Sequence, residues 1–203
     1  QSGQRPKGPS SRSYQAYAGY RYFGPCQVIK PPGFFISYGG MKIVFSKRYT
    51  VPDYGHVFRS DKFEETLEAL IREGAVLRRD VVEPARPSKK DLQLAHTRRW
   101  VEKNLRFEFT MADCARAELE ILHGVVLAHL MNVGGSIKAA ELALEDGLGL
   151  HCGGGSHHAF AGRVEGFCLL NDIAVAVKKL LKTKKIRRAL ILDLDAHQGN
   201  GKD

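Results

Sequence analysis

Two apolar runs in this chain each end abruptly in a stretch rich in glycine, histidine and aspartate, and this feature restricts the possible folds most. Residues 148–152 lead into three glycines and the adjacent pair His157 and His158. Residues 189–195 are continuously apolar until two aspartates interrupt them. Ligands of open parallel sheets bind beyond the carboxyl ends of the strands. The pattern therefore predicts two strands that bring polar side chains to one edge of a sheet.

Helical patterns alternate with these runs. Asp61 and Glu64 resemble a capping box, an apolar face follows through Ile71, and Gly74 is placed to end the helix. Four more helices are expected: one from Ser88 past Trp100, one over 119–130, one capped by Ser136 that runs to Leu144, and one from Asp172 to Leu181. With a further strand at 41–45, the alternation predicts an α/β domain with a parallel sheet flanked by helices.

Residues 1–40 differ from the rest in composition. They are rich in Gly, Pro, Ser and Tyr and show no sustained period, and Met41 follows them directly. We expect a poorly ordered leader, tag or upstream extension at 1–40 and a domain over 41–203. An acid-poor organelle transit segment is the alternative.

Charge and cysteine usage narrow the class of protein. The net charge is +9, but residues 1–40 supply more than half of it, with five basic and no acidic residues. The other basic cluster, 178–188, suits a solvated helix end better than a specific nucleic-acid site. No apolar run reaches the roughly 18 residues of a membrane span. The four cysteines form no CxxC pair, so we expect reduced thiols and a soluble, cytoplasmic protein.

The second polar stretch suggests a metal. In an extended segment, Asp193, Asp195 and His197 lie on one face because alternate residues share a side. Two adjacent carboxylates repel, and a cation resolves that conflict. Carboxylate and imidazole ligands suit zinc or iron(II), and the absence of thiolate indicates a catalytic ion. Taken alone, a histidine pair or an Asp-x-Asp more often has a purely structural explanation; the two stretches together favour a site.

The number of metal ions can also be argued. Arginase-type enzymes, which hold two manganese ions, carry Asp-Ala-His-x-Asp at this strand end. Here Gly199 stands where the last aspartate would be, so we expect one ion. The later motifs of metallophosphatases are absent as well.

Four segments resemble one family, the zinc-dependent histone deacetylases and their bacterial relatives: GGSIKAAELAL at 134–144, GGSHHA at 154–159, EGFCLLND at 165–172 and DLDAHQGNG at 193–201. The last wording is similar to the class IV branch. The resemblance covers about 41–203 and implies an arginase/deacetylase-type fold that is incomplete at the C-terminus.

The resemblance also implies roles. Asp195 and His197 match two of the three ligands of a single zinc ion, and His158 matches the general base. His157 matches the histidine that holds the water, and Asp193 the carboxylate that orients it. Three further features match the family: Phe167 as a wall of the acyl-lysine tunnel, the Gly166 carbonyl as an acceptor for the substrate amide, and main-chain oxygens of Asp193, Asp195 and His197 as ligands of a structural monovalent cation.

Two departures from the family pattern matter. Asn200 stands where most members have an aspartate beside the second histidine, and a neutral amide stabilises an imidazolium less than a carboxylate does. The third ligand, an aspartate, and the oxyanion-stabilising tyrosine would follow Asp203. Asp53, Tyr54 and His56 lie in a segment similar to a family rim loop but are not placed to replace them. We therefore expect the chain alone to be inactive and prone to self-association.

Three functions remain open. The favoured one is an amidohydrolase acting on an acylated amine, either acyl-lysine or a polyamine. A non-catalytic acyl-lysine-binding module of the same fold is the second, and an arginase-like metallohydrolase is the third. Both histidines favour the enzyme, because a binding module has no need of a general base.

Overall fold

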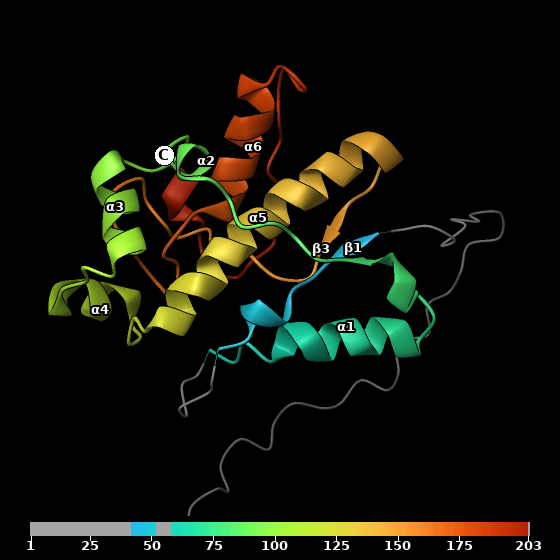
Figure 1. Cartoon of the computed structure of the whole chain (residues 1–203), viewed down its shortest axis with the longest axis horizontal. Helices are drawn as coiled ribbons and strands as arrows, with labels where there is room; N and C mark the ends of the chain where they lie inside the picture. The colour runs from blue at the N-terminus through green and yellow to red at the C-terminus, as the bar shows by residue number, and fades with distance from the viewer. Residues whose placement is uncertain (1–41, 52–57, 203) are drawn as a thin grey trace, which may run out of the picture. The chain divides into compact units, whose positions relative to one another are not determined.

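A three-stranded parallel sheet forms the centre of the described part of the chain. The structure, a computed structural model, describes residues 42–51 and 58–202. Strands β1 (Ile43–Val44), β2 (Val81–Val82) and β3 (Leu150–His151) lie in the order β2-β1-β3. Ile43 is opposite Val81 on one side and Leu150 on the other. The predicted α/β class with a parallel sheet is therefore confirmed (Figure 1).

In the described residues six α-helices accompany the sheet: α1 (Lys62–Arg72), α2 (Lys89–Leu92), α3 (Arg98–Arg106), α4 (Met111–Ala117), α5 (His123–Asp146) and α6 (Asp172–Lys182). Three short 3-10 helices lie in the same part of the chain: η1 (Lys47–Tyr49), η2 (Arg78–Asp80) and η3 (Asn200–Lys202). Two of the α-helices cover the two faces of the sheet. Ile43 packs in one cluster with Leu67 of α1, whereas Val44 packs with Ala139 and Leu142 of α5. Successive strand residues point to opposite faces, so this alternation makes a helix–sheet–helix arrangement.

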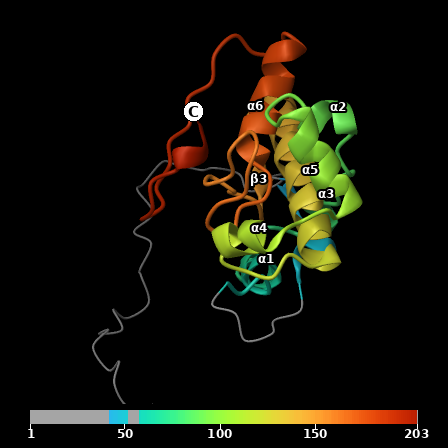
Figure 2. The same cartoon turned by 90° about the vertical axis from the view of Figure 1, so that its left-hand side faces the viewer.

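A second core lies on the side of α5 that faces away from the sheet. Val126, Leu130 and Val133 of α5 pack there with Trp100 of α3 and Val175 of α6. Figure 2 shows α5 and α6 side by side with α3 close to them. The Trp100 indole nitrogen donates to the main-chain oxygen of Leu169 over 2.9 Å, which satisfies the one polar atom of a buried ring. This core fixes the start of α6 relative to α5.

The helix expected to begin at Ser136 is instead the second half of α5, which runs without a break through Gly134 and Gly135. Both glycines are buried, and they allow close approach rather than a turn. A Cβ at Gly135 would overlap the Tyr49 hydroxyl and the His151 ring. Ser136 is therefore not a cap; its hydroxyl donates to the carboxylate of Asp172.

Other helix ends also differ from expectation. The helix predicted from Ser88 past Trp100 is two helices, because Thr97 caps a new one, α3. Asp61 precedes α1 without a side-chain cap bond, since its carboxylate pairs with Arg59 instead. The side-chain cap of α6 is Asn171, one residue before the expected one.

The run 189–195 is not a strand in the described structure. Leu190 and Leu194 are 92% and 86% exposed, and no described strand pairs with this segment. An extended apolar segment is stable only where a neighbour satisfies its backbone and covers its side chains. In Figure 2 the segment after α6, in red, runs apart from the helices.

Several expectations lie outside the described residues: the leader at 1–40 and the rim segment with Asp53, Tyr54 and His56. Among the described cysteines, Cys114, Cys152 and Cys168 are free thiols. No described helix has both the length and the hydropathy needed to cross a bilayer.

Candidate active site

The glycine-rich turn after β3 is held by side chains of two helices. Gly154 and Gly155 have φ values of +69° and +81°, which L-residues with side chains rarely adopt. The carboxylate of Asp172 accepts from the backbone N–H groups of Gly155 (3.1 Å) and Ser156 (2.8 Å). Asn132 of α5 accepts from the Gly154 N–H over 2.8 Å. The turn that leads to the histidine pair is therefore fixed from both sides.

Asp172 is completely buried and belongs to a series of hydrogen-bonded side chains that sequence reasoning missed. Ser136 connects it to His151 Nδ1 (3.0 Å), and His151 Nε2 contacts the Tyr49 hydroxyl (3.0 Å). Burial lowers the pKa of His151 to about 4 and raises that of Tyr49 well above its ordinary value. These hydrogen bonds connect the glycine-rich turn to β3 and to Tyr49. The sequence indicated Asp172 only as the start of a predicted helix.

The histidine pair is the centre of the site, and its two rings have different partners. The ring centroids lie 4.1 Å apart. His157 Nδ1 is 2.9 Å from the Asp193 carboxylate, whereas His158 Nδ1 is 2.8 Å from Oδ1 of Asn200. Because each ring is held through Nδ1, Nε2 is the nitrogen left for chemistry in both.

Asn171 connects the two predicted motifs. Its amide group donates to the main-chain oxygens of Ala159 and Gly201, both over 3.1 Å, and the Gly201 N–H donates to the His157 oxygen over 2.8 Å. The backbone N–H of Asn171 donates to Nε2 of buried His96 over 2.9 Å. The residues on both sides of the histidine pair are therefore fixed by the start of α6.

The second motif is organised by short-range hydrogen bonds. The Asp195 carboxylate accepts from the His197 N–H over 2.8 Å and lies 3.1 Å from His197 Nδ1. The backbone bond from His197 is the main cause of the lowered pKa of Asp195. One oxygen of the Asp193 carboxylate pairs with His157, and the other accepts from the Asp195 N–H over 3.1 Å. The structure thus brings all three predicted residues together, with Asp195 in direct contact with His197 and Asp193 between His157 and the Asp195 backbone.

Asp195 and His197 are the two predicted zinc ligands that lie in contact with each other. A carboxylate and an imidazole are ligands that zinc accepts. Within residues 42–51 and 58–202, no group of three or more His, Cys, Asp or Glu side chains is placed to hold an ion. Asp195 and His197 therefore fit as part of a coordination shell, with at least one ligand to come from elsewhere. Burial raises the pKa of the Cys168 thiol, which lines one cavity with these two residues, to about 11.

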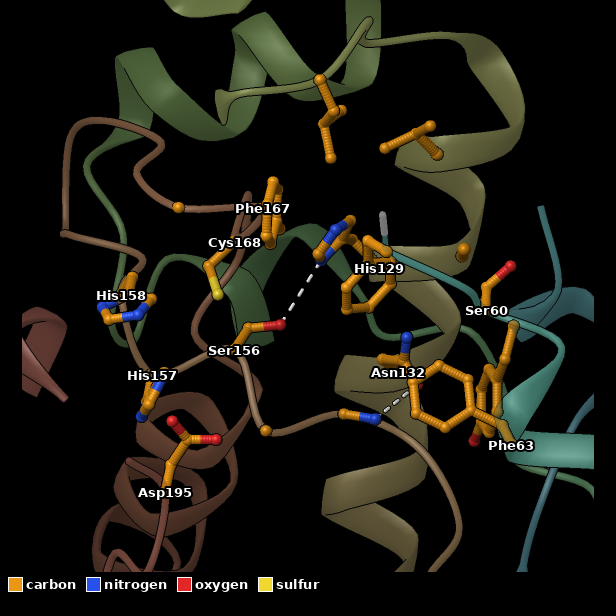
Figure 3. A pocket seen from close by; sticks show the side chains of 18 of the residues that line it. Ser60, Phe63, His129, Asn132, Ser156, His157, His158, Phe167, Cys168 and Asp195 are labelled. Carbon is orange, nitrogen blue, oxygen red and sulfur yellow. Dashed lines mark hydrogen bonds between the residues drawn. The ribbon is translucent and has the colours of Figure 1, made fainter. Parts of the chain in front are cut away.

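A cavity of about 830 Å³ opens in front of these residues, and Figure 3 shows His157, His158, Phe167 and Asp195 around it. The C-terminal end of α4 positions one wall: main-chain oxygens of Arg116 and Ala117 accept from the N–H groups of Gly166 and Phe167. A Cβ at Gly166 would lie 2.9 Å from the His158 ring, so the backbone approaches that histidine closely.

Phe58 is a second aromatic residue at this cavity, and sequence reasoning missed it. Its ring centroid lies 5.7 Å from that of Phe167. The two rings together line an apolar approach to the histidines. Phe58 comes two residues after the rim-like segment with Asp53, Tyr54 and His56, but no sequence signal singled it out.

Comparison with known proteins gives consistent results. The family model for the histone deacetylase domain matches residues 56–203. The chain is 37% identical over 80% of its length to an uncharacterized protein of Picosynechococcus, 33% identical over 79% to histone deacetylase 2 of Arabidopsis thaliana, and 32% identical over 72% to the acetoin utilization protein AcuC of Bacillus subtilis. It spans 54%, 44% and 40% of those proteins, respectively.

Solved structures resemble the described fold. The crystal structure of a histone deacetylase homolog from Aquifex aeolicus matches with a TM-score of 0.63 and 22% identity, covering 79% of this chain and 46% of that one. The HDA15 HD domain matches with a TM-score of 0.60 and 21% identity. At this identity the likeness concerns the fold alone, of which the chain contains about half.

Proposed function

The chain belongs to the histone deacetylase family, and from this premise we propose that it supplies one part of a zinc-dependent deacetylase site. The observation that carries the proposal is the histidine pair: two adjacent imidazoles held through Nδ1, one by a carboxylate and one by an amide. An acyl-lysine-binding module would need the cavity walls but not this arrangement. The proposed substrate is an acylated amine, with acyl-lysine favoured over a polyamine.

The two histidines would have different tasks. His158 matches the second histidine of the family and would be the general base: its Nδ1 is held by Asn200, and its Nε2 would take a proton from water and later deliver it to the leaving amine. His157, paired with Asp193, would hold the water and stabilise negative charge in the transition state.

Asp195 and His197 would hold the zinc, together with an aspartate outside the described residues. When bound, zinc polarises the acyl carbonyl and lowers the pKa of the attacking water. The main-chain oxygens of Asp193, Asp195 and His197 are proposed to bind a structural monovalent cation.

The acyl-lysine side chain would lie along the aromatic wall that Phe167 and Phe58 form together, because its methylene groups are apolar. The carbonyl of Gly166, a residue whose backbone passes close to the His158 ring, would accept the substrate amide proton. The exposed Leu190, Leu192 and Leu194 support the further proposal that the 203-residue chain self-associates when purified alone.

The test compares the 203-residue chain with a longer protein in which this chain is joined to a region carrying the third ligand and the tyrosine. Zinc content and hydrolysis of an acetyl-lysine peptide and an acetylated polyamine are measured for both. We expect one zinc per chain and turnover in the longer protein only, because two ligands leave the ion exposed to water. Two manganese ions per chain would favour the arginase-like alternative, and peptide binding without turnover would favour the binding module.

A further inference from the structure

Asn200 is bonded at both ends of its side chain, and its second partner is a residue to which no role has been given. Its Oδ1 lies 2.8 Å from His158 Nδ1, and its Nδ2 donates to Oε1 of Glu165 over 2.6 Å. Glu165 belongs to a tight turn closed by an antiparallel bridge to Cys168. A carboxylate on a fixed turn therefore reaches the amide that holds His158.

The chemistry of the three groups fixes their orientation. A side-chain amide has a donor end and an acceptor end of nearly the same shape, and either could face His158. A carboxylate can only accept, so Glu165 requires the NH₂ end of Asn200. Oδ1 must then face His158, and because Oδ1 can only accept, the proton of a neutral imidazole must be on Nδ1. This leaves the lone pair on Nε2.

The position of Glu165 is itself determined by a neighbour. Its other oxygen, Oε2, accepts from the Arg163 guanidinium over 3.3 and 3.4 Å, and that guanidinium lies 3.5 Å above the centre of the Phe160 ring. The Arg163–Glu165 pair is partly exposed, so it adds little to stability by itself. The Arg163 guanidinium nevertheless occupies Oε2 of Glu165, which leaves Oε1 to accept from Asn200.

We propose that Glu165 is a positioning residue that sets the amide orientation of Asn200 and thereby the Nδ1–H tautomer of His158. Its catalytic consequence rests on the proposed function, in which His158 accepts a proton at Nε2. The tautomer does not rest on it, because it follows from the hydrogen bonds alone. An aspartate at position 200, as in most of the family, has two acceptor oxygens. Either oxygen could accept from His158, so Glu165 would not be needed to orient the side chain.

The experiment measures the tautomer directly. The 203-residue chain is labelled with ¹⁵N-histidine, freed of metal with EDTA and studied by long-range ¹H–¹⁵N correlation about two units above the ordinary histidine pKa of about 6.5. Loss of one ring system in H158Q assigns the signals. We expect His158 in the Nδ1–H form. In E165Q, which can present a donor or an acceptor to Asn200, the ratio of Nδ1–H to Nε2–H should fall about fivefold, the typical value of one net hydrogen bond.

The matched control is Asn200→Asp, alone and combined with E165Q. Both N200D variants should keep the Nδ1–H form, because a carboxylate at position 200 can only accept. An unchanged tautomer ratio in folded E165Q would overturn the proposal. An equal change of the ratio on E165Q substitution with Asn200 present and in the N200D variant would overturn it as well. Circular dichroism establishes that each variant is folded. If E165Q does not fold, Arg163→Ala replaces it and should shift the ratio in the same direction by a smaller factor.

The same variants separate this proposal from the proposed function. In the longer protein, E165Q should lower turnover when residue 200 is Asn. It should not lower turnover in the N200D variant, because there E165Q removes the repulsion between the carboxylates at positions 165 and 200. Absence of deacetylase activity in every variant, with the tautomer shift intact, would refute the proposed function and leave the positioning role. Normal turnover and an unshifted tautomer in E165Q would refute the positioning role alone.

Discussion

The turn before the histidine pair and the segment before the proposed zinc ligands differ sharply in how they are held. Gly155 and Ser156 are bonded to a buried carboxylate of α6, and Leu170 beside that helix is fully buried. Asp195 and His197 bond mainly to each other, and Leu194 between the aspartates is 86% exposed. The first half of the site is preorganised by contacts within this chain. The second half is held by hydrogen bonds between neighbouring residues, and its leucines do not pack into a described core.

The largest expected effect is that of Asp172→Ala, which leaves the buried N–H of Ser156, the N–H of Gly155 and the Ser136 hydroxyl without their acceptor. We expect the free energy of unfolding to fall by about 3–5 kcal/mol, since each unsatisfied buried group costs about 1–3 kcal/mol. Asp195→Ala is the matched control and should change stability by less than about 0.5 kcal/mol in the absence of metal, as surface changes usually do. Urea denaturation measures both. Equal losses of unfolding free energy in the two variants would mean that the two halves of the site are held equally firmly.

A pair of leucines sharpens the same contrast. Leu170→Ala empties a fully buried position and should cost about 2–5 kcal/mol. Leu194→Ala changes an exposed side chain and should cost less than about 0.5 kcal/mol. Thermal unfolding of the two variants side by side gives the comparison. A large loss for Leu194→Ala would mean that the 189–195 segment is packed, as the sequence first suggested.

A smaller effect is expected on acidification. Burial lowers the pKa of His96 to about 4, below its unfolded value of about 6.5. Folding therefore favours the neutral ring, whose stabilising effect is complete above about pH 6.5 and is lost as the pH falls toward about 4. Between about pH 7 and pH 5 this single group should lower the free energy of unfolding by about 2 kcal/mol.

His96→Gln tests this assignment to one group. The variant removes the titrating ring near the start of α6, so the decrease between the two pH values should shrink by about the same 2 kcal/mol. Its absolute stability also falls, because the N–H of Asn171 loses its acceptor. An unchanged pH dependence would assign the acid sensitivity to other groups.

The α/β class followed from alternation of helical and extended patterns, and these are local properties of the sequence. The family resemblance implied the partners of His157 and His158, and in the structure Asp193 and Asn200 lie within hydrogen-bond distance of them. The break at Gly134 was wrong because glycine permits close packing as well as turns, and only the tertiary neighbours decide between them. The strand at 189–195 was wrong for a related reason, since pairing depends on a neighbour that periodicity cannot reveal.

Residues that act through others were also beyond sequence reasoning. Glu165 and Asp172 lie inside a recognised motif, yet their partners are 35 and 16 or 17 residues away. Phe58 contacts Phe167 from a part of the chain that is more than 100 residues away in the sequence. Such roles come from tertiary contacts, which a single sequence does not specify.

The most direct test of the central claim compares His158→Ala with His197→Ala in the longer protein described above. His158→Ala should retain one zinc per chain and lower kcat for an acetyl-lysine peptide by at least about 100-fold, because loss of a general base typically costs about 10²–10⁴-fold. His197→Ala should lose the zinc itself. Unchanged turnover in His158→Ala, or full zinc retention in His197→Ala, would contradict the account.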